Sequence, residues 1–168
     1  MKTYKRITKL KEAVNLVYDL LQKPITVADI GTDHGYLAEA LSKTSYVETI
    51  LASDISAKSL SKLEQKIEYK KLKNIKTFVG DGLNPIAKAD VSVIAGIGGH
   101  EIIKILETQN KTESGNNKCD YFILQPAQNV IELRNWLFEN KIIPSSIVNN
   151  EQEFNKFIAE PFTLPLMM

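Results

Sequence analysis

Residues 25–35 of this chain read Ile25-Thr-Val-Ala-Asp-Ile-Gly-Thr-Asp-His-Gly35, and this stretch decides how the sequence folds. Its first six residues are mainly apolar or β-branched and are followed by Gly31, which is the form of a buried parallel strand. From residue 33 to residue 43 the pattern becomes helical. The apolar side of this helix is expected to hold Tyr36, Leu37, Ala40 and Leu41. The stretch therefore predicts a strand, a tight turn and a helix.

The rest of the chain repeats this alternation of strands and helices. Further strands are expected at residues 46–52, 75–79, 91–95 and 121–124, with weaker ones near 142–148 and 156–162. Helices are expected at residues 8–22, 33–43, 56–72, 100–108 and 129–139. We predict a Rossmann-like α/β fold with an open, mostly parallel seven-stranded sheet and helices on both faces. No change in composition divides the chain, so residues 1–168 are expected to form one domain whose N-terminal helix lies within residues 1–22.

The composition excludes several classes of protein. The 168 residues are 43% hydrophobic and 24% charged, which is ordinary for a folded domain and too apolar for a disordered chain. No apolar run approaches the ~18 residues of a membrane-spanning helix, and the basic N-terminus lacks the cleavage site of a secretory signal. A single cysteine, Cys119, excludes an internal disulfide, and His34 and His100 give little basis for a metal site. We expect a soluble, cytoplasmic protein that requires neither a membrane nor a metal.

Charge is segregated along the chain, although the formal net charge is only +1. Residues 1–23 hold six basic and two acidic side chains, and residues 56–80 hold seven lysines and two glutamates. Between them, residues 29–54 hold five acidic side chains against Lys43 alone. An acidic site suits a small cation, and basic flanks suit a polyanion such as nucleic acid. The alternative is that the lysines only solvate the faces of helices.

Acidic residues stand where the predicted strands end, which is where parallel α/β sheets bind their ligands. Asp33 occupies the position of the second glycine in the G-x-G-x-x-G fingerprint of dinucleotide-binding folds. A carboxylate there would repel a pyrophosphate, whereas S-adenosylmethionine has no phosphate and carries an ammonium and a sulfonium group. Asp29 and Asp33 therefore favour S-adenosylmethionine over NAD, and Gly31 allows the tight turn. The alternative for Asp33 is a simple N-cap of the helix.

Two further strands also end in acids. Asp54 follows the second strand, where an acid accepts both hydroxyls of an adenosine ribose in many nucleotide-binding folds. Asp81, between Gly80 and Gly82, could accept a hydrogen bond from the amino group of adenine. An NAD-linked oxidoreductase would use the same ribose contact, and an Asp-Gly pair also forms turns without a ligand. Three acids at successive strand ends are nevertheless a more specific pattern than any one of them.

Five stretches, taken in order, resemble the bacterial tRNA (adenine-22 N1)-methyltransferases, which are class I S-adenosylmethionine-dependent methyltransferases. They are Asp29-Ile-Gly-Thr-Asp-His-Gly-Tyr-Leu37, Gly80-Asp-Gly-Leu83, Ala95-Gly-Ile-Gly-Gly99, Ile123-Leu-Gln-Pro126 and Leu133-Arg-Asn-Trp-Leu137. The resemblance covers roughly residues 5–140. Members of that family usually continue into a helical C-terminal extension that helps to hold tRNA. This chain stops at Met168, so no such extension is expected in it.

The resemblance implies transfer of a methyl group from S-adenosylmethionine to N1 of an adenine in tRNA. N1 has an in-plane lone pair, so positioning matters more than a strong base. The implied catalytic residues are Asp33 and His34. Cofactor contacts are expected from Asp29, Gly31, Asp33, Gly35, Asp54, Ile55, Asp81, Gly82, Gly96 and Arg6, with Arg6 binding the methionyl carboxylate. Contacts with RNA phosphates are expected from Lys9, Lys58, Lys62, Lys66 and Lys70.

Several interpretations stay open beside this one. The glycines of residues 96–99 leave room for a planar base, but they also suit a tightly packed helix start. Gln125 and Pro126 could border the pocket for the base, or proline could simply end the strand. The chain could also be a methyltransferase for another RNA or a small molecule, or a non-catalytic RNA-binding module.

Overall fold

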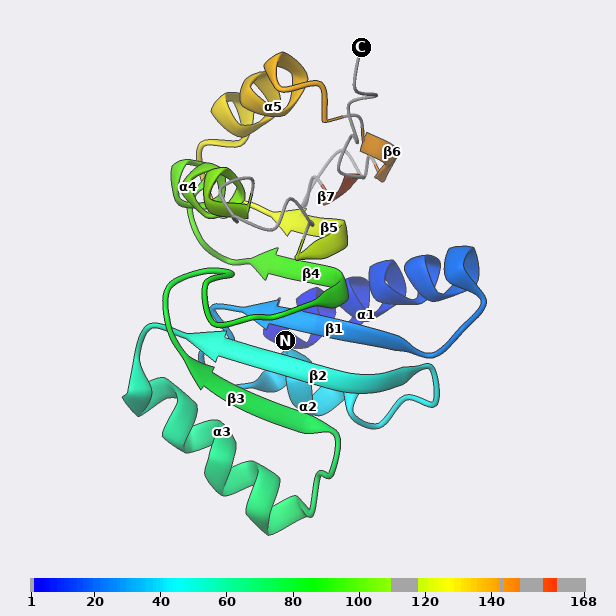
Figure 1. The fold of residues 1–168 in the computed structure, drawn as a ribbon, viewed down its shortest axis with the longest axis vertical. Helices are drawn as coiled ribbons and strands as arrows, with labels where there is room; N and C mark the ends of the chain where they lie inside the picture. Colours follow the sequence, from blue (N-terminus) through cyan, green and yellow to red (C-terminus); the bar gives the residue numbers. More distant parts are fainter. Residues whose placement is uncertain (1, 110–117, 143, 149–155, 160–168) are drawn as a thin grey trace.

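The computed structural model describes residues 2–109, 118–142, 144–148 and 156–159, and Figure 1 shows the arrangement of their helices and strands. The helices are α1 (Lys2–Leu21), α2 (Tyr36–Leu41), α3 (Ala57–Lys70), α4 (Gly99–Gln109) and α5 (Val130–Glu139). The strands are β1 (Ile25–Ile30), β2 (Val47–Asp54), β3 (Ile75–Val79), β4 (Ala89–Ala95), β5 (Cys119–Gln125), β6 (Pro144–Val148) and β7 (Lys156–Ala159).

All the strands belong to one sheet, in the order β3-β2-β1-β4-β5-β7-β6. β1 pairs in parallel with both β2 and β4, and β3 and β5 continue the parallel sheet on either side. Beyond β5, β7 and β6 add an antiparallel edge. The strand order therefore reverses between β1 and β4. Open α/β sheets bind ligands beside such a reversal, at the carboxyl ends of the strands.

Two apolar layers, one on each face of the sheet, hold the helices in place. Successive residues of a strand point to opposite faces, so Val27 joins one layer and Ala28 the other. The first layer receives Leu10, Val14 and Val17 from α1, Leu37, Ala38 and Leu41 from α2, and Leu63 from α3. The second receives Ile102 and Leu106 from α4, and Leu133 and Leu137 from α5. The parallel strands are thus covered on both sides, which explains their nearly continuous apolar sequences.

The expected mostly parallel α/β sheet with helices on both faces is confirmed. Within the described residues each expected strand and helix is present, and only the ends differ. The largest difference is at α1, which begins at Lys2 instead of residue 8. Parts of the last two expected strands, residues 143 and 160–162, lie outside the described residues.

Two expectations about the first crossover helix are wrong. α2 is shorter than residues 33–43 because Asp33 and Gly35 have φ angles of 49° and 68°, which a right-handed helix cannot include. The N-cap is therefore Gly35, and Asp33 does not have the alternative role of N-cap. Tyr36 is 49% exposed and Ala40 is only partly buried, so neither belongs to the buried side of α2 as expected. The buried side of α2 consists of Leu37, Ala38 and Leu41.

Candidate functional site

The turn after β1, residues 31–35, is the centre of the candidate site. Gly31, Asp33 and Gly35 all have positive φ angles, so the chain alternates in and out of the left-handed region. The N–H groups of Gly31 and Thr32 both donate to the carbonyl of Ser53, over 2.9 and 3.0 Å. These two bonds attach the turn to the carboxyl end of the neighbouring strand β2. The left-handed conformation of Asp33 is strained, and strained residues of this kind are common at ligand-binding turns.

Asp29 lies buried directly beneath this turn, with 5% of its surface exposed. The Thr32 hydroxyl donates a 2.8 Å hydrogen bond to its carboxyl group. Burial raises the pKa of Asp29 to about 6, although the Thr32 hydroxyl, the backbone of Ala38 and the charge of Arg6 oppose the rise. The turn therefore covers the carboxyl group of Asp29, and a nearby cation would favour the ionised form of this group.

Asp54, at the end of β2, joins the same cluster. One carboxylate oxygen accepts the backbone N–H of Asp33 over 3.0 Å, and the other accepts that of Ser56 over 2.8 Å. The carboxylate of Asp33 is itself 70% exposed and lies 3.1 Å from Nδ1 of His34. Ile55, next to Asp54, leaves 74% of its surface exposed at this edge. Asp29, Asp33 and Asp54 are therefore brought together, as the sequence predicts.

The loop after β3 lies against the end of β2. The N–H of Gly80 donates to the carbonyl of Asp54 over 3.0 Å, and the Ser53 hydroxyl donates to the carbonyl of Gly82 over 3.2 Å. These bonds hold Asp81, which is exposed, at the same edge of the sheet as Asp54. Asp81, the acid expected after the third strand, therefore lies at the same edge of the sheet as Asp54.

Arg6 reaches the carboxyl end of β4 from the first turns of α1. Its Nη1 atom lies 2.9 Å from the position that a Cβ on Gly96 would occupy, so the absence of a side chain at residue 96 makes room for the guanidinium. The N–H of Gly96 donates to the carbonyl of Gln125 over 3.0 Å. Nε of Arg6 and Oε1 of Gln125 are both buried without a hydrogen-bond partner in the described residues. A buried donor and a buried acceptor without partners are costly unless a ligand completes them.

Gln125 was not among the predicted cofactor contacts, and neither were Thr32 and Ser53. All three are polar residues that become buried at strand ends. The available signal was their polarity within apolar strand sequences, such as the final residue of Cys119–Gln125. Because only tertiary packing decides which polar residue loses contact with water, that signal did not separate them from ordinary turn residues.

The predicted phosphate-binding lysines do not behave alike. Lys58 and Lys62 are exposed on α3, whereas Lys66 donates to the carbonyl of His34 over 2.8 Å. Lys70 pairs with Glu39 at 2.6 Å. Lys9 is partly buried on α1. The four lysines of α3 thus do not form one uniform exposed row.

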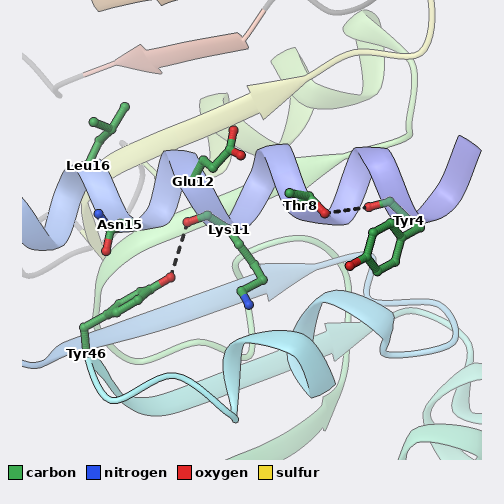
Figure 2. A pocket seen from close by; sticks show the side chains of 7 residues that line it. All are labelled: Tyr4, Thr8, Lys11, Glu12, Asn15, Leu16 and Tyr46. Atoms are coloured by element: carbon green, nitrogen blue, oxygen red, sulfur yellow. Dashed lines mark hydrogen bonds between the residues drawn. The ribbon is translucent and has the colours of Figure 1, made fainter.

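A separate pocket of about 580 Å³ runs along α1 and is shown in Figure 2. Its walls include Tyr4, Lys11, Glu12 and Tyr46, and the Tyr46 hydroxyl donates a long, 3.4 Å hydrogen bond to the carbonyl of Lys11. The complete lining consists of Tyr4, Thr8, Lys11, Glu12, Asn15, Leu16 and Tyr46. None of the predicted cofactor contacts lines this pocket, so it is distinct from the acidic cluster.

The described part of the chain also bears on metal sites and on membrane spans. Across residues 2–109, 118–142, 144–148 and 156–159, no group of three or more His, Cys, Asp or Glu side chains is placed to hold a metal ion. Within the same ranges, no helix combines the length and the apolar character that crossing a bilayer requires.

Several known proteins are similar to this chain in sequence and in fold. A family described as "Methyltransferase domain" matches residues 10–158. A provisionally named tRNA methyltransferase of Mycoplasma genitalium is 36% identical over 151 residues, which are 85% of this chain and 66% of that protein. The tRNA (adenine(22)-N(1))-methyltransferase of Bacillus subtilis is 30% identical over 136 residues, 79% of this chain and 56% of that protein.

A solved structure adds a bound molecule to this comparison. M. capricolum TrmK, in complex with S-adenosyl-homocysteine, has a TM-score of 0.66 and 26% identity over 88% of this chain and 66% of its own. The chain spans 56–66% of the length of the two relatives in sequence. The resemblance noted from the five sequence stretches is confirmed, and the chain belongs to the methyltransferase domain family.

Proposed function

We propose that this chain transfers a methyl group from S-adenosylmethionine to N1 of an adenine in tRNA, at position 22. The observation that carries the proposal is the acidic cluster of Asp29, Asp33 and Asp54 around a left-handed turn at the strand-order reversal. A phosphate-free cation suits this cluster, and a pyrophosphate does not. The names of the Bacillus and Mycoplasma relatives support tRNA as the substrate. The S-adenosyl-homocysteine bound to TrmK supports the cofactor.

The residues present fit the adenosine half of this cofactor. Each oxygen of the Asp54 carboxylate accepts one backbone N–H and keeps capacity for a ribose hydroxyl. Ile55 offers an exposed apolar side chain to the adenine ring, and Asp81 offers an acceptor to its amino group. Gly82 has no side chain, so the backbone beside Asp81 leaves room for the ring. We propose that the sheet is the seven-stranded sheet of a class I methyltransferase, with this edge as its nucleoside site.

Two of the buried groups that have no hydrogen-bond partner in the described residues fit the amino-acid half. Nε of Arg6 is a donor for the methionyl carboxylate, and Oε1 of Gln125 is an acceptor for the adjacent ammonium. Nη1 of Arg6 lies against Gly96, whose N–H donates to the backbone carbonyl of Gln125, and Gly31 and Gly35 shape the turn after β1, the strand beside β4. A ligand carrying both charges on one carbon would satisfy both groups together. That complementarity distinguishes S-adenosylmethionine from NAD.

Bound S-adenosylmethionine supplies a methyl group that can pass to the N1 lone pair, leaving neutral S-adenosylhomocysteine and a cationic methyladenine. The carboxylate of Asp33 is exposed at the turn and would stabilise the positive charge on the base. His34, whose Nδ1 lies 3.1 Å from the Asp33 carboxylate, would border the base. Asp33 and His34 are therefore our candidates for the catalytic residues. Lys9, Lys58 and Lys62 are candidate contacts for RNA phosphates.

Mass mapping of methyl groups tests this function. We expect the chain, given labelled S-adenosylmethionine and a tRNA transcript, to form 1-methyladenine at position 22 and none in a transcript with guanine there. Asp33→Ala should lose at least 100-fold in rate and still bind tRNA. Asp120→Ala is the matched control, since Asp120 pairs with Lys88 at the opposite ends of the strands.

Other outcomes identify the alternatives. Binding of S-adenosylhomocysteine without methylation of tRNA would indicate a methyltransferase for another RNA or a small molecule. Binding of tRNA without either adenosine ligand would indicate a non-catalytic RNA-binding module. Tighter binding of NAD than of S-adenosylhomocysteine in calorimetry would overturn the assignment of the acidic cluster.

A further inference from the structure

Lys66 on α3 points toward the protein, unlike its exposed neighbours along the helix. Its ammonium donates a 2.8 Å hydrogen bond to the backbone carbonyl of His34 and lies 4.1 Å from the centroid of the Tyr36 ring. A carboxylate oxygen of Glu39 is 3.9 Å away. The side chain of Lys66 is 27% exposed, so much of its donor capacity is used within the protein. A lysine in this position is poorly placed to bind an RNA phosphate.

The partners of Lys66 lie on both sides of Gly35, the last residue of the left-handed turn. Gly35 has a φ of 68°, and glycine leaves the backbone free to rotate there. One ammonium binds the carbonyl before this glycine and covers the aromatic ring after it. Lys66 therefore restrains the relative orientation of His34 and Tyr36. His34 and Tyr36 also contact each other, edge to face, with ring centroids 5.8 Å apart.

This restraint continues to the acidic cluster. The backbone N–H of Asp33, next to His34, binds the Asp54 carboxylate over 3.0 Å, and Nδ1 of His34 lies 3.1 Å from the Asp33 carboxylate. The His34 carbonyl belongs to the peptide unit that joins His34 to Gly35, and the Gly35 N–H donates to the carbonyl of Thr32 over 2.8 Å, so loss of the Lys66 contact would loosen residues 32–35 around Asp33. Lys43 at 2.9 Å and Lys70 at 2.6 Å both bind Oε1 of Glu39, whereas the Lys66 ammonium lies 3.9 Å from the other oxygen, Oε2.

We infer that Lys66 is a positioning residue for the candidate cofactor site, which holds residues 33–36 in their binding conformation through the His34 carbonyl and the Tyr36 ring. It does not contact RNA. The identity of the ligand in this inference rests on the proposed function. The conformational restraint by Lys66 does not depend on it.

Calorimetry with S-adenosylhomocysteine and three variants tests the inference. Lys66→Met keeps an unbranched side chain that is shorter by one atom and removes the ammonium, so we expect the Kd to rise about tenfold. Lys66→Arg should recover most of the affinity, since a guanidinium can donate to the same carbonyl and stack on Tyr36. Lys43→Met is the matched control, because it removes another lysine partner of Glu39 and leaves the His34 contact intact. It should bind S-adenosylhomocysteine as the wild type does.

Two further measurements separate positioning from general stability and from RNA binding. Amide hydrogen exchange of residues 31–36 should be faster in Lys66→Met, while exchange in the rest of α3 and the thermal midpoint stay close to the wild type. Affinity for a tRNA transcript without cofactor should change less than twofold.

An unchanged Kd for S-adenosylhomocysteine in Lys66→Met, or an equal loss in Lys43→Met, would overturn the inference. So would a loss of tRNA affinity with normal cofactor binding, which would make Lys66 a phosphate contact. If the wild type does not bind S-adenosylhomocysteine, the proposed function fails. Hydrogen exchange then decides the restraint, and unchanged exchange of residues 31–36 would refute it.

Discussion

Asp29 carries a carboxyl group in a place where ionisation is unfavourable. Its pKa of about 6, raised mainly by burial, lies above the ~3.9 of an aspartate in an unfolded chain. The folded state therefore binds this proton more tightly, and the stability that it contributes is lost as pH rises through about 6. Between pH 5 and pH 7.5 the free energy of unfolding of the wild type should fall by about 1 kcal/mol because of Asp29. This part of the fall should be absent in Asp29→Asn. Urea unfolding at both pH values measures it, and equal pH dependence in the two proteins would contradict it.

The same carboxyl group makes cofactor affinity depend on pH. A bound cation favours the ionised form of Asp29, so binding should release a proton below the pKa of about 6. We expect the affinity for S-adenosylmethionine to fall up to about tenfold per pH unit below that value. Calorimetry from pH 5 to pH 8 tests this, and Asp29→Asn should give a weaker, nearly flat profile. A flat profile in the wild type would show that Asp29 does not interact with the cation.

Gly31 and Gly35 illustrate two different reasons why a position requires glycine. Both have a positive φ angle, but only Gly35 also lacks space for a Cβ. Their φ angles are 70° and 68°, so an alanine at either position should cost about 1 kcal/mol in backbone strain. A Cβ at residue 31 meets no atom within 4 Å, but one at residue 35 overlaps the buried side chain of Leu63. We expect Gly35→Ala to destabilise the fold by about 1–3 kcal/mol more than Gly31→Ala. Equal losses in urea unfolding would mean that Leu63 moves away freely.

At the scale of elements, Gly99 determines how closely the start of α4 approaches α5. A Cβ on Gly99 would overlap the backbone carbonyl of Asn129, whose carbon would be 3.0 Å away. At Gly98 the closest atom would be in the Gln128 side chain, at 3.4 Å. Backbone cannot rotate away as a side chain can, so we expect Gly99→Ala to cost about 2–3 kcal/mol and Gly98→Ala under about 1. Thermal unfolding compares them, and a smaller loss for Gly99→Ala would contradict this packing.

For the whole molecule, the segregation of charge predicts where RNA lies. Lys58 and Lys62 are exposed on α3, so each is expected to release one counterion from bound tRNA. Replacing each with methionine should lower the slope of log affinity against log salt by about one per lysine. Lys104→Met is the control, because α4 packs on the other face of the sheet from α3 and the exposed Lys104 pairs with Glu101 at 3.0 Å. An unchanged slope in the α3 variants would remove this face from the RNA interface.

The sequence alone determined the alternation of strands and helices and the placing of acids at successive strand ends. Both depend on local patterns: apolar periodicity decides the type of an element, and parallel strands bring their carboxyl ends to one edge. The cluster of Asp29, Asp33 and Asp54 was predictable for that reason. The left-handed backbone of Asp33 was not, because an aspartate at a helix start suits an N-cap equally well.

Only the tertiary structure decided which polar groups lose water and which charges turn inward. Lys66 and Lys62 have the same chemistry and similar spacing on α3, but Lys66 faces the carbonyl of His34 from a distant part of the chain. Nε of Arg6 and Oε1 of Gln125 are buried because α1 packs over β4 and β5, which are separated from it in the sequence by at least three other strands and two helices. Such contacts depend on the free energy of packing the complete sheet, which no short stretch of residues contains.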